Sequence, residues 1–498
     1  MIFADIVASK SGLKIPIFSD GKPMHSKYDP EREAKNSIST IQKRDCFLVL
    51  GTGGAYHIKE LVRKYPDAMI LAVEKSQEDL DYLSKEIPCV KEILSYKNVR
   101  IVFPESIRTE LSKYFIPSLY SSFEVIKNTP WCIFNAQTLP QITESINSSL
   151  REISQDFSTQ SYFGKQWTKN IIQNLKHCKN NRKIKIQIEK TAAIIAAGPT
   201  LEKNISRLKD ERSQLYIIAT DTAFKILLKH GIYPDAVFSV DGQFVSINHF
   251  LQTPECSPLF IFELTANHNA VKKITEKQYN VIFTVSGHPL ELLAKSRSPE
   301  SFFQNDSSSG TVTIAAVDFA LKTGFSKILI FGADFAYSNG KTYSSGTYLD
   351  DLYSMDQKKI RTQETAFSAL MYRTELQPVS ETKCTTAILD SYRIAFENWI
   401  LANNAISKKE NEIYTVIAEK NEKNGEIQTK GFDFNNFANF LKSEIKIILK
   451  EDIKEQLSNP VVVSILPLIA YLKKQKQETK SFEEYLKLAF SFIVRYTN

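Results

Sequence analysis

Short apolar runs alternate with amphipathic stretches through the middle of the chain. The runs occupy residues 192–197, 215–219, 236–240, 259–264, 281–286 and 327–332. They are mostly apolar along their whole length, which is typical of strands buried on both faces. Between them, apolar residues recur at helical spacing, as Leu201, Ile205 and Leu208 do, and Gly231 stands where a helix is expected to end. Strands that alternate with helices predict a parallel sheet covered on both faces.

The same pattern occurs ahead of the central region, in residues 47–76. FLVL is read as a strand and GTGG as a glycine-rich turn, and a helix and a second strand follow, with Glu74 at the end of that strand. This order predicts a Rossmann-type unit. Gly51–Gly54 with Glu74 is also similar to a methyltransferase cofactor site. Because Tyr56 and His57 crowd the start of the helix, a structural or acceptor-binding role is the favoured interpretation.

Changes in composition suggest where domains begin and end. Residues 174–190 are basic and polar, and beyond about residue 355 the chain is charged and helical in pattern, although 412–419 could return one strand to the central sheet. We therefore expect an α/β protein with a central parallel Rossmann-like sheet. The predicted domains are an N-terminal domain with the Rossmann-like unit at 1–175, a central α/β domain at 190–355 and a mainly helical C-terminal domain at 356–498.

Composition narrows the class of protein. With 43% hydrophobic and 24% charged residues in a chain of 498, the sequence is that of a globular protein with several domains. The net charge is +7, but the Lys and Arg residues are interspersed with Asp and Glu, which indicates a solvated surface rather than a nucleic-acid groove. The six cysteines are scattered without a CxxC or Cys/His cluster, which argues against a zinc site or a disulfide framework and favours a reducing compartment.

No segment has the pattern of a targeting or membrane-spanning sequence. The first residues, MIFADIVASK, lack a basic stretch followed by a long apolar one. The most apolar run, 461–472, is too short for a span and contains Pro467. We therefore expect a cytoplasmic protein without a membrane span.

The strongest local chemistry lies directly after the run 192–197, where Gly198-Pro199-Thr200 opens a helix. Backbone N–H groups and the helix dipole at such a start attract an anion. Gly198 permits close backbone approach, Pro199 fixes the turn, and the Thr200 hydroxyl can cap the helix or bond a phosphate oxygen. A capped strand-to-helix turn without a ligand explains the same residues equally well.

Polar residues also follow other strands of the predicted sheet. Asp221 ends the run IIATD and Asp241 ends VFSVD, so both are expected at the carboxyl edge of the sheet, where they could hold a ribose, a metal ion or an acceptor hydroxyl. For Asp221 the alternative is N-capping of the next helix. Ser309 and Gly310, in the run SSSG, open a later helix and form a second predicted anion-binding element.

The loop after the strand 327–332 carries further donors. It begins at Asp334 and contains Tyr337, Lys341 and Tyr343. Phenol and ammonium donors on a loop at a strand end could neutralise the charge that develops on a leaving phosphate. The alternative is a surface hairpin with Asn339-Gly340 as its turn.

Together these motifs resemble one family. GPTL, TDTAFKILLKHGIYPDAVFSVD and the SSG–helix–strand–GADFAYSNGKTY run are similar in order and spacing to the motility-associated factor (Maf) flagellin glycosyltransferases. The central domain of that family is similar to bacterial sialyltransferases that use CMP-activated nonulosonic acids. The likeness is carried by residues 190–355, and the Rossmann-like region ahead and the helical region behind also resemble the Maf layout.

The resemblance implies a role for individual residues. Tyr337 and Tyr343 match two tyrosines near the donor phosphate, and Asp241 and His288 are the candidates for the general base that an acceptor hydroxyl requires. The residues that would bind the nucleotide sugar are Gly198, Pro199, Thr200, Asp221, Ser309, Gly310 and Asp334.

The chain departs from the family at several of these positions. The family usually has Gly-Pro-Ser where Thr200 stands, and Maf relatives often have His at the position of Tyr343. The sialyltransferases have a basic His downstream of this loop, whereas the last His of this chain is His288, so the identity of the base stays open. His57 and His249 are interpreted as structural.

The expected function follows from the resemblance. It is the transfer of a nonulosonic acid of the pseudaminic or legionaminic type from a CMP-sugar to Ser or Thr hydroxyls of flagellin, in support of flagellum assembly and motility. One alternative is an archaeal-type pterin diphosphokinase that uses ATP and Mg²⁺ held by carboxylates such as Asp221 and Asp241. Another is a non-catalytic flagellin-binding accessory protein. No metal site is assigned, and Mg²⁺ is the one candidate cofactor.

Overall fold

The computed structural model divides the chain into two compact units. Unit 1 is Met1–Gly164 with Leu466–Phe482, and unit 2 is Lys165–Ile465 with Glu483–Asn498. No helix within the described residues is long and apolar enough to cross a membrane. The structure describes residues 1–180, 183–251, 256–307, 311–357, 362–403, 405–418, 425–427, 429–450, 459–475 and 480–497.

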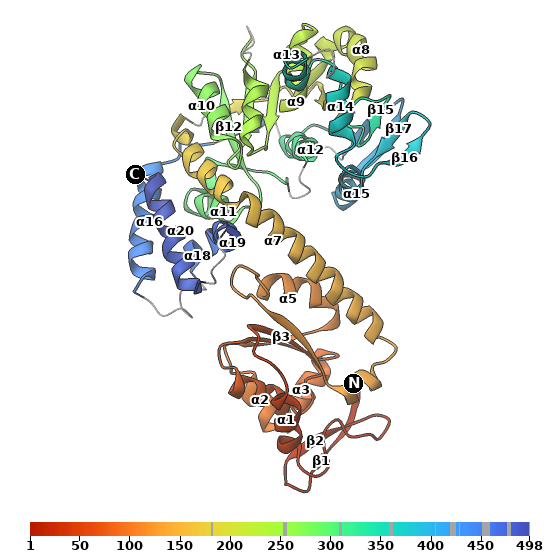
Figure 1. The fold of residues 1–498 in the computed structure, drawn as a ribbon, viewed down its shortest axis with the longest axis vertical. Coiled ribbons are helices and arrows are strands. Elements are labelled where there is room, and N and C mark those ends of the chain that lie inside the picture. Colours follow the sequence, from red (N-terminus) through yellow and green to blue (C-terminus); the bar gives the residue numbers. More distant parts are fainter. Residues whose placement is uncertain are drawn as a thin grey trace. The chain divides into compact units, whose positions relative to one another are not determined.

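Unit 1 is built on a four-stranded parallel sheet of order β5-β4-β3-β6 (Figure 1). Its strands are β3 (Cys46–Leu50), β4 (Met69–Val73), β5 (Val99–Val102) and β6 (Phe123–Lys127), beside the hairpin of β1 (Phe3–Ala8) and β2 (Lys14–Phe18). Its helices are α1 (Pro30–Ser39), α2 (Tyr56–Lys64), α3 (Gln77–Glu86), α4 (Pro88–Ile93), α5 (Ile107–Tyr114), α6 (Thr129–Phe134) and α19 (Leu466–Gln475). Every residue of β3 is buried, as its apolar sequence predicts.

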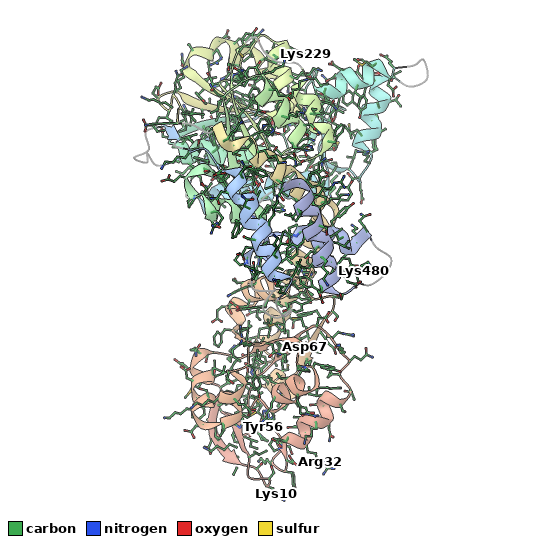
Figure 2. All side chains as sticks on the ribbon, turned by 90° about the vertical axis from the view of Figure 1, so that its left-hand side faces the viewer. Lys10, Arg32, Tyr56, Asp67, Lys229 and Lys480 are labelled. Atoms are coloured by element: carbon green, nitrogen blue, oxygen red, sulfur yellow. The ribbon has the colours of Figure 1, made fainter. Side chains whose placement is uncertain are left out.

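In unit 1 an aromatic ring lies in the interior and charged side chains lie at the surface. The Tyr56 ring is buried and its hydroxyl donates to the Lys14 carbonyl at 2.6 Å, whereas Lys10 and Arg32 are exposed (Figure 2). The long helix α7 (Leu139–Leu175) begins in unit 1 and ends in unit 2.

Unit 2 is built on a nine-stranded sheet of order β13-β12-β11-β10-β9-β8-β14-β19-β18. The strands from β13 to β14 are parallel, and β19 and β18 are added antiparallel to β14. Its strands are β8 (Thr191–Ile195), β9 (Leu215–Thr220), β10 (Ala236–Ser239), β11 (Leu259–Glu263), β12 (Val281–Val285), β13 (Phe303–Gln304), β14 (Lys327–Phe331), β18 (Ile406–Glu410) and β19 (Ile413–Ile417). The α/β fold with a dominant parallel sheet, predicted from the sequence, is confirmed.

Helices and short sheets complete unit 2. The helices are α8 (Ile205–Asp210), α9 (Asp221–Lys229), α10 (His268–Glu276), α11 (Pro289–Arg297), α12 (Val312–Thr323), α13 (Tyr348–Met355), α14 (Gln363–Met371), α15 (Ala387–Ala402), α16 (Phe434–Ile448), α18 (Pro460–Ser464) and α20 (Phe482–Thr497). The short sheets join β15 (Tyr337–Ser338), β17 (Lys383–Thr385) and β16 (Gln377–Ser380), and β7 (Ile184–Lys185) with β20 (Glu426–Ile427).

The order of the strands in unit 2 locates a crevice. From β8 the chain proceeds to β9 on one side, and it returns much later to β14 on the other side. In such sheets ligands bind at the carboxyl ends of the strands where the order reverses. The turn Gly198–Thr200 follows β8 and therefore lies at this switch point.

The compact units do not follow the boundaries that composition suggested. The division at Gly164 and Lys165 falls inside the continuous helix α7, ahead of the basic stretch 174–190. The predicted C-terminal domain, 356–498, is divided between the two units. It also contributes β19, which pairs with β14, so the strand that 412–419 was expected to return to the central sheet is present.

Candidate functional site

The turns after β8 and β14 pack backbone to backbone. The Gly198 amide donates to the Gly332 carbonyl at 2.8 Å. A Cβ atom on Gly198 would lie 2.4 Å from that same oxygen, and Gly332 has a φ of +67°. Both positions therefore require glycine, one for close approach and one for its left-handed backbone.

Thr200 and Asp334 join these two turns through their side chains. The Thr200 amide donates to Asp334 Oδ2 at 2.8 Å, and the Thr200 hydroxyl donates to Asp334 Oδ1. Burial raises the pKa of Asp334, while the hydrogen bonds from Thr200 lower it. The Thr200 amide and hydroxyl thus bind the carboxylate of Asp334, which joins the turn after β8 to the turn after β14.

The segment after β15 is attached to the same turn. The Ser344 amide donates to the Ala197 carbonyl at 2.8 Å, and the Ser344 hydroxyl donates to the Gly198 carbonyl at 2.6 Å. Lys341 Nζ lies 2.9 Å from both carboxylate oxygens of Glu202. These bonds hold the tyrosine-bearing loop against the carboxyl end of β8.

Tyr343 is the more exposed of the two predicted phenol donors. Its side chain is 38% exposed, although burial of its hydroxyl raises its pKa, and the neighbouring groups Tyr337, Asp221 and Asp241 raise it further. Tyr337 is half-buried in β15, where it pairs with Cys384 of β17. The two tyrosines and the two aspartates therefore share one electrostatic neighbourhood at the carboxyl edge of the sheet.

Asp221 is held by the next strand and is not the N-cap of α9. The N-cap is Thr220, whose hydroxyl accepts from the Ala223 amide at 3.3 Å. Asp221 Oδ2 accepts from the Ser239 hydroxyl at 2.6 Å, and its Oδ1 accepts from the Thr222 amide at 2.7 Å. Thr220 therefore caps α9 in place of Asp221, and the Asp221 carboxylate is fixed between β9 and β10.

Asp241 has the electrostatics of a base. Its Oδ1 accepts from the Gln243 amide at 2.8 Å. Burial raises the pKa of Asp241 to about 6, the Gln243 amide opposes the rise, and the charge of Asp221 adds to it. A carboxylate of this pKa is ionised at neutral pH and still basic enough to accept a proton from a hydroxyl during transfer.

His288, the other candidate base, has a different role in the fold. It is the N-cap of α11, and its Nδ1 accepts from the Leu290 amide at 3.2 Å. Burial lowers the pKa of His288 to about 3, so the ring is neutral and a weak base. It follows β12, which β11 and β10 separate from β9 in the sheet.

Ser309 and Gly310 lie outside the described residues, so their convergence with Gly198 stays a prediction. The flanking residues are described. Thr311 caps α12 by accepting from the Ile314 amide at 3.2 Å, and the Asp306 amide donates to Asp318 Oδ2 at 2.7 Å. Helix α12 leads from this segment to β14.

Two residues near the predicted site were not selected from the sequence. Tyr348 begins α13, and its ring centroid lies 4.8 Å from that of His249. Burial lowers the pKa of His249, whereas the charge of Asp221 raises it. Tyrosines recur at 337, 343 and 348, within twelve residues, and this repetition could have led to the selection of Tyr348 from the sequence. No comparable repetition pointed to His249, which lies in the η5 segment (Phe244–Phe250) and was interpreted as structural.

The glycine turn of unit 1 is filled by the protein itself. The Gly53 amide donates to Glu74 Oε2 at 3.2 Å, and the Gly54 amide donates to His25 Nε2 at 2.8 Å. Trp131 Nε1 donates to Glu74 Oε1 at 3.0 Å, and a Cβ atom on Gly51 would lie 2.5 Å from the Trp131 ring. These contacts favour the structural interpretation of this turn over cofactor binding.

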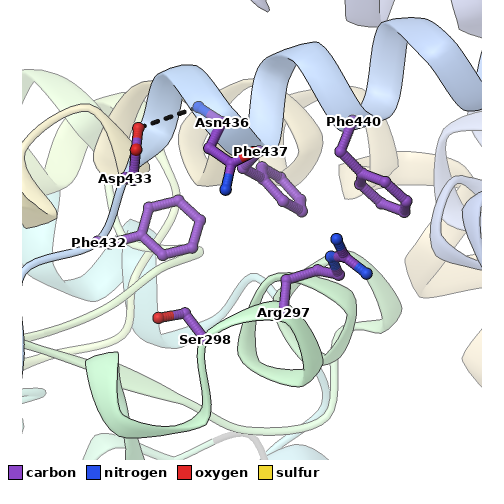
Figure 3. Close-up of a pocket in the computed structure, with 7 residues that line it drawn as sticks. All are labelled: Arg297, Ser298, Phe432, Asp433, Asn436, Phe437 and Phe440. Carbon is purple, nitrogen blue, oxygen red and sulfur yellow. Dashed lines mark hydrogen bonds between the residues drawn. The ribbon is translucent and has the colours of Figure 1, made fainter.

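Unit 2 also has a small pocket away from the predicted site. Figure 3 shows a pocket of about 80 Å³ between the end of α11 and the start of α16. Arg297 lies 4.3 Å from the centre of the Phe440 ring there. The pocket contains none of the predicted site residues. In the described parts of the chain, no three His, Cys, Asp or Glu side chains are grouped to hold a metal ion.

Comparisons with known proteins agree with this fold. Residues 165–340 match the family model described as 6-hydroxymethylpterin diphosphokinase MptE-like. An uncharacterized protein of Treponema pallidum (strain Nichols) is 32% identical over 152 residues, which are 30% of this chain and 72% of that protein. A second uncharacterized protein of the same organism is 27% identical over 247 residues, 48% of this chain and 75% of that protein.

A solved structure extends the comparison to nearly the whole chain. The Maf glycosyltransferase of Magnetospirillum magneticum AMB-1 is similar over 99% of this chain and 86% of its own, with a TM-score of 0.52 and 13% sequence identity. The resemblance inferred from the motifs is thereby confirmed at the level of the fold.

Proposed function

We propose that this chain, which belongs to one family with the Treponema pallidum protein of 32% identity and has the fold of a Maf glycosyltransferase, is a glycosyltransferase. The observation that carries the proposal is that Asp221 and Asp241 follow the carboxyl ends of the neighbouring strands β9 and β10, and that their charges raise the pKa of Tyr343. Phenol donors beside a basic carboxylate, at a switch point of a parallel sheet, are the groups that transfer to a hydroxyl requires.

The donor in this proposal is a CMP-activated nonulosonic acid of the pseudaminic or legionaminic type, and the acceptor is a Ser or Thr hydroxyl of flagellin. The acceptor oxygen forms a bond to the anomeric carbon while the bond from that carbon to the phosphate oxygen breaks, and CMP leaves with the electron pair. Tyr343 and Tyr337 donate to the departing phosphate, and Asp241 accepts the proton of the hydroxyl. His288 is not used, because its low pKa and its capping bond make it a poor base.

Intact-mass analysis of flagellin tests this function. The purified chain is incubated with unglycosylated flagellin and either CMP-pseudaminic or CMP-legionaminic acid, and the expected result is a mass increase of one sugar or several. A matched reaction with the Asp241→Asn variant serves as the control. Flagellin of unchanged mass with both donors would refute the proposal.

One observation supports a second candidate. The family model that matches residues 165–340 carries the name of a pterin diphosphokinase. An enzyme of that kind transfers a diphosphate group from ATP. Asp221 and Asp241 would then hold Mg²⁺. Thermal-shift measurements with CMP and with ATP plus Mg²⁺ separate the two, because a ligand stabilises only the protein that binds it. Stabilisation by ATP plus Mg²⁺ alone would favour the diphosphokinase.

A further inference from the structure

Three charged residues share one face of α9. Asp221, Lys225 and Lys229 are each four residues apart, a spacing that places side chains on the same side of a helix. Lys225 is only 6% exposed, which is rare for lysine unless its charge has a partner. The helix therefore presents the site residue Asp221 at its start and two cations one and two turns further on.

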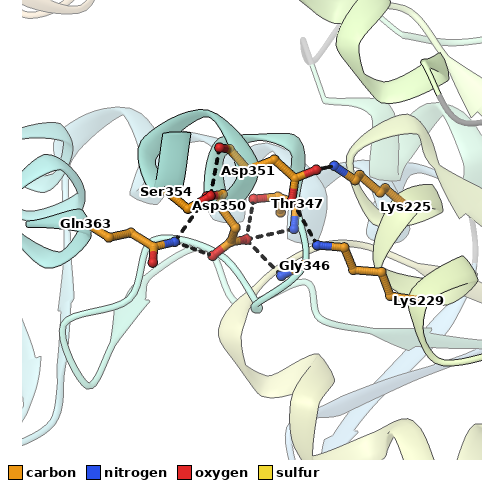
Figure 4. A network of polar contacts seen from close by, with 8 residues as sticks. All are labelled: Lys225, Lys229, Gly346, Thr347, Asp350, Asp351, Ser354 and Gln363. Carbon is orange, nitrogen blue, oxygen red and sulfur yellow. Dashed lines mark hydrogen bonds and ion pairs between the residues drawn. The ribbon is translucent and has the colours of Figure 1, made fainter. Parts of the chain in front are cut away.

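Both cations bind one carboxylate of α13. Asp351 accepts hydrogen bonds from Lys225 and from Lys229, the latter at 3.1 Å (Figure 4). The bond from Lys225 lowers the pKa of Asp351, and Lys229 lowers it further. The cluster thus stays charged at neutral pH and joins α13 to α9.

The neighbouring carboxylate, Asp350, fixes the segment that leads into α13. The amides of Gly346 and Thr347 both donate to Asp350 Oδ2 at 2.8 Å, and Gln363 Nε2 of α14 lies 3.3 Å from its Oδ1. Gly346 has a φ of +108°, and a Cβ atom there would lie 3.2 Å from Lys229 Cδ. The chain therefore passes close to α9 before the helix begins.

This network holds Tyr348, the first residue of α13, beside the proposed donor site. Tyr343 precedes the network and Tyr348 begins α13, where its ring meets His249. Burial raises the pKa of Tyr348 to about 12, and the groups Tyr343, Asp241 and Asp221 contribute to the rise. The loop that carries Tyr343 has its own bonds to the turn after β8, whereas the position of the Tyr348 ring beside His249 depends on where α13 is held.

We propose that Lys225 is a positioning residue of the donor site, which clasps α13 through Asp351 and so fixes the Tyr348 ring beside His249. This inference rests on the proposed glycosyltransferase function. Lys225 does not touch the reacting atoms and acts through the helix that it holds. Lys229 binds the same carboxylate from a more exposed position and contributes less.

The test compares two lysines that share one partner. Lys225→Met removes the cation but keeps the apolar length of the side chain, and Lys229→Met is the matched control. We expect Lys225→Met to weaken CMP binding about tenfold, as measured by calorimetry. In the transfer assay the same variant should change KM more than kcat. Lys229→Met should change the CMP affinity by less than about twofold. Lys225→Arg is expected to restore most of the affinity, because it restores the charge.

Hydrogen exchange supplies a readout that does not depend on the identity of the donor. In Lys225→Met the amides of residues 346–355 are expected to exchange faster, while those of β8 and β9 keep the rate of the unaltered chain. Unchanged exchange in residues 346–355 would overturn the clasp whatever ligand the site binds. Faster exchange with unaltered CMP affinity would overturn its positioning role, and failure of the unaltered chain to bind CMP would overturn the proposed function and this role with it.

Discussion

Each unit of this protein has a glycine turn directly after the strand at which the order of its parallel sheet reverses. In unit 1 the turn Gly51–Gly54 follows β3, which lies between β4 and β6. In unit 2 the turn Gly198–Thr200 follows β8, which lies between β9 and β14. The place of the turn in the sheet is the same in both units, and the transfer site proposed above lies at the second turn.

The difference comes from side chains that reach the turns from distant segments. His25, Glu74 and Trp131 close the turn of unit 1, and Trp131 and Glu74 are completely buried. In unit 2 one carboxylate, Asp334, stabilises the turn, and the neighbouring Tyr343 stays 38% exposed. A glycine turn at a switch point thus predicts that the backbone packs closely there. Whether the turn is filled by the protein or left open to a ligand depends on side chains from distant segments.

Replacing Asp241, the proposed base, is expected to have the largest effect. Asp241→Asn should lower kcat/KM by about a thousandfold, since general base catalysis of this kind typically contributes a hundredfold to ten-thousandfold. Because the pKa of Asp241 is about 6, the rate of the unaltered chain should rise with pH through about 6, and the variant should lose this rise. Rates measured from pH 5 to 8 check both. A variant rate within about threefold of the unaltered rate would exclude Asp241 as the base.

Trp131→Ala tests whether the turn of unit 1 is only structural. Removal of this fully buried ring should decrease the free energy of unfolding of unit 1 by about 4 kcal/mol, because a cavity replaces it and Glu74 loses a donor. Native-state hydrogen exchange of β3 and β4 amides measures the change, and CMP affinity should be unaltered. Trp131→Phe, which keeps most of the ring, is the matched control and should be milder.

Glu74→Gln should remove a pH dependence of unit 1. Burial raises the pKa of Glu74 from 4.5 to about 7, so the folded state favours the protonated form. Its contribution to stability is complete below pH 4.5 and is lost as the pH rises through about 7, at most about 3 kcal/mol. Exchange measurements on β3 amides between pH 5 and 8 should show this decline in the unaltered chain and a flatter profile in the variant. Equal profiles would mean that Glu74 does not titrate in this range.

Tyr343→Phe is the mildest of these changes. It removes one donor to the leaving phosphate and keeps the ring, so turnover should fall about tenfold with little change in unfolding free energy. Steady-state rates and a melting curve separate the two effects. If the rate stays the same, Tyr343 has no role in transfer, and the contrast between the two turns would rest on the aspartates alone.

The sequence predicted the elements that depend on local patterns. The six central apolar runs are strands, and Gly231, where a helix was expected to end, follows α9 with a φ of +68°. Asp221 and Asp241 were placed together because consecutive parallel strands end at one edge. These predictions needed only periodicity and the topology of strand and helix alternation.

What could not be predicted depends on contacts between residues far apart in the chain. Asp334 binds Thr200 across 134 positions, and His25 reaches Gly54 across 29. No local pattern records which carboxylate will satisfy an amide, so the offer of the Thr200 amide to a phosphate had to be revised. The low pKa of His288 likewise follows from burial that its sequence neighbours do not reveal.

The division of unit 1 between two parts of the chain has a consequence for biosynthesis. Helix α19 completes unit 1, since the Ser118 hydroxyl donates to the Leu466 carbonyl at 3.2 Å and Gly164 leaves room for the Pro467 carbonyl. The ribosome must therefore translate residues 165–465 before this unit can close, on the order of tens of seconds at roughly 5–20 residues per second. Throughout that interval the nascent N-terminal unit exposes the surface that α19 covers in the folded protein, and chaperones bind exposed surfaces of this kind.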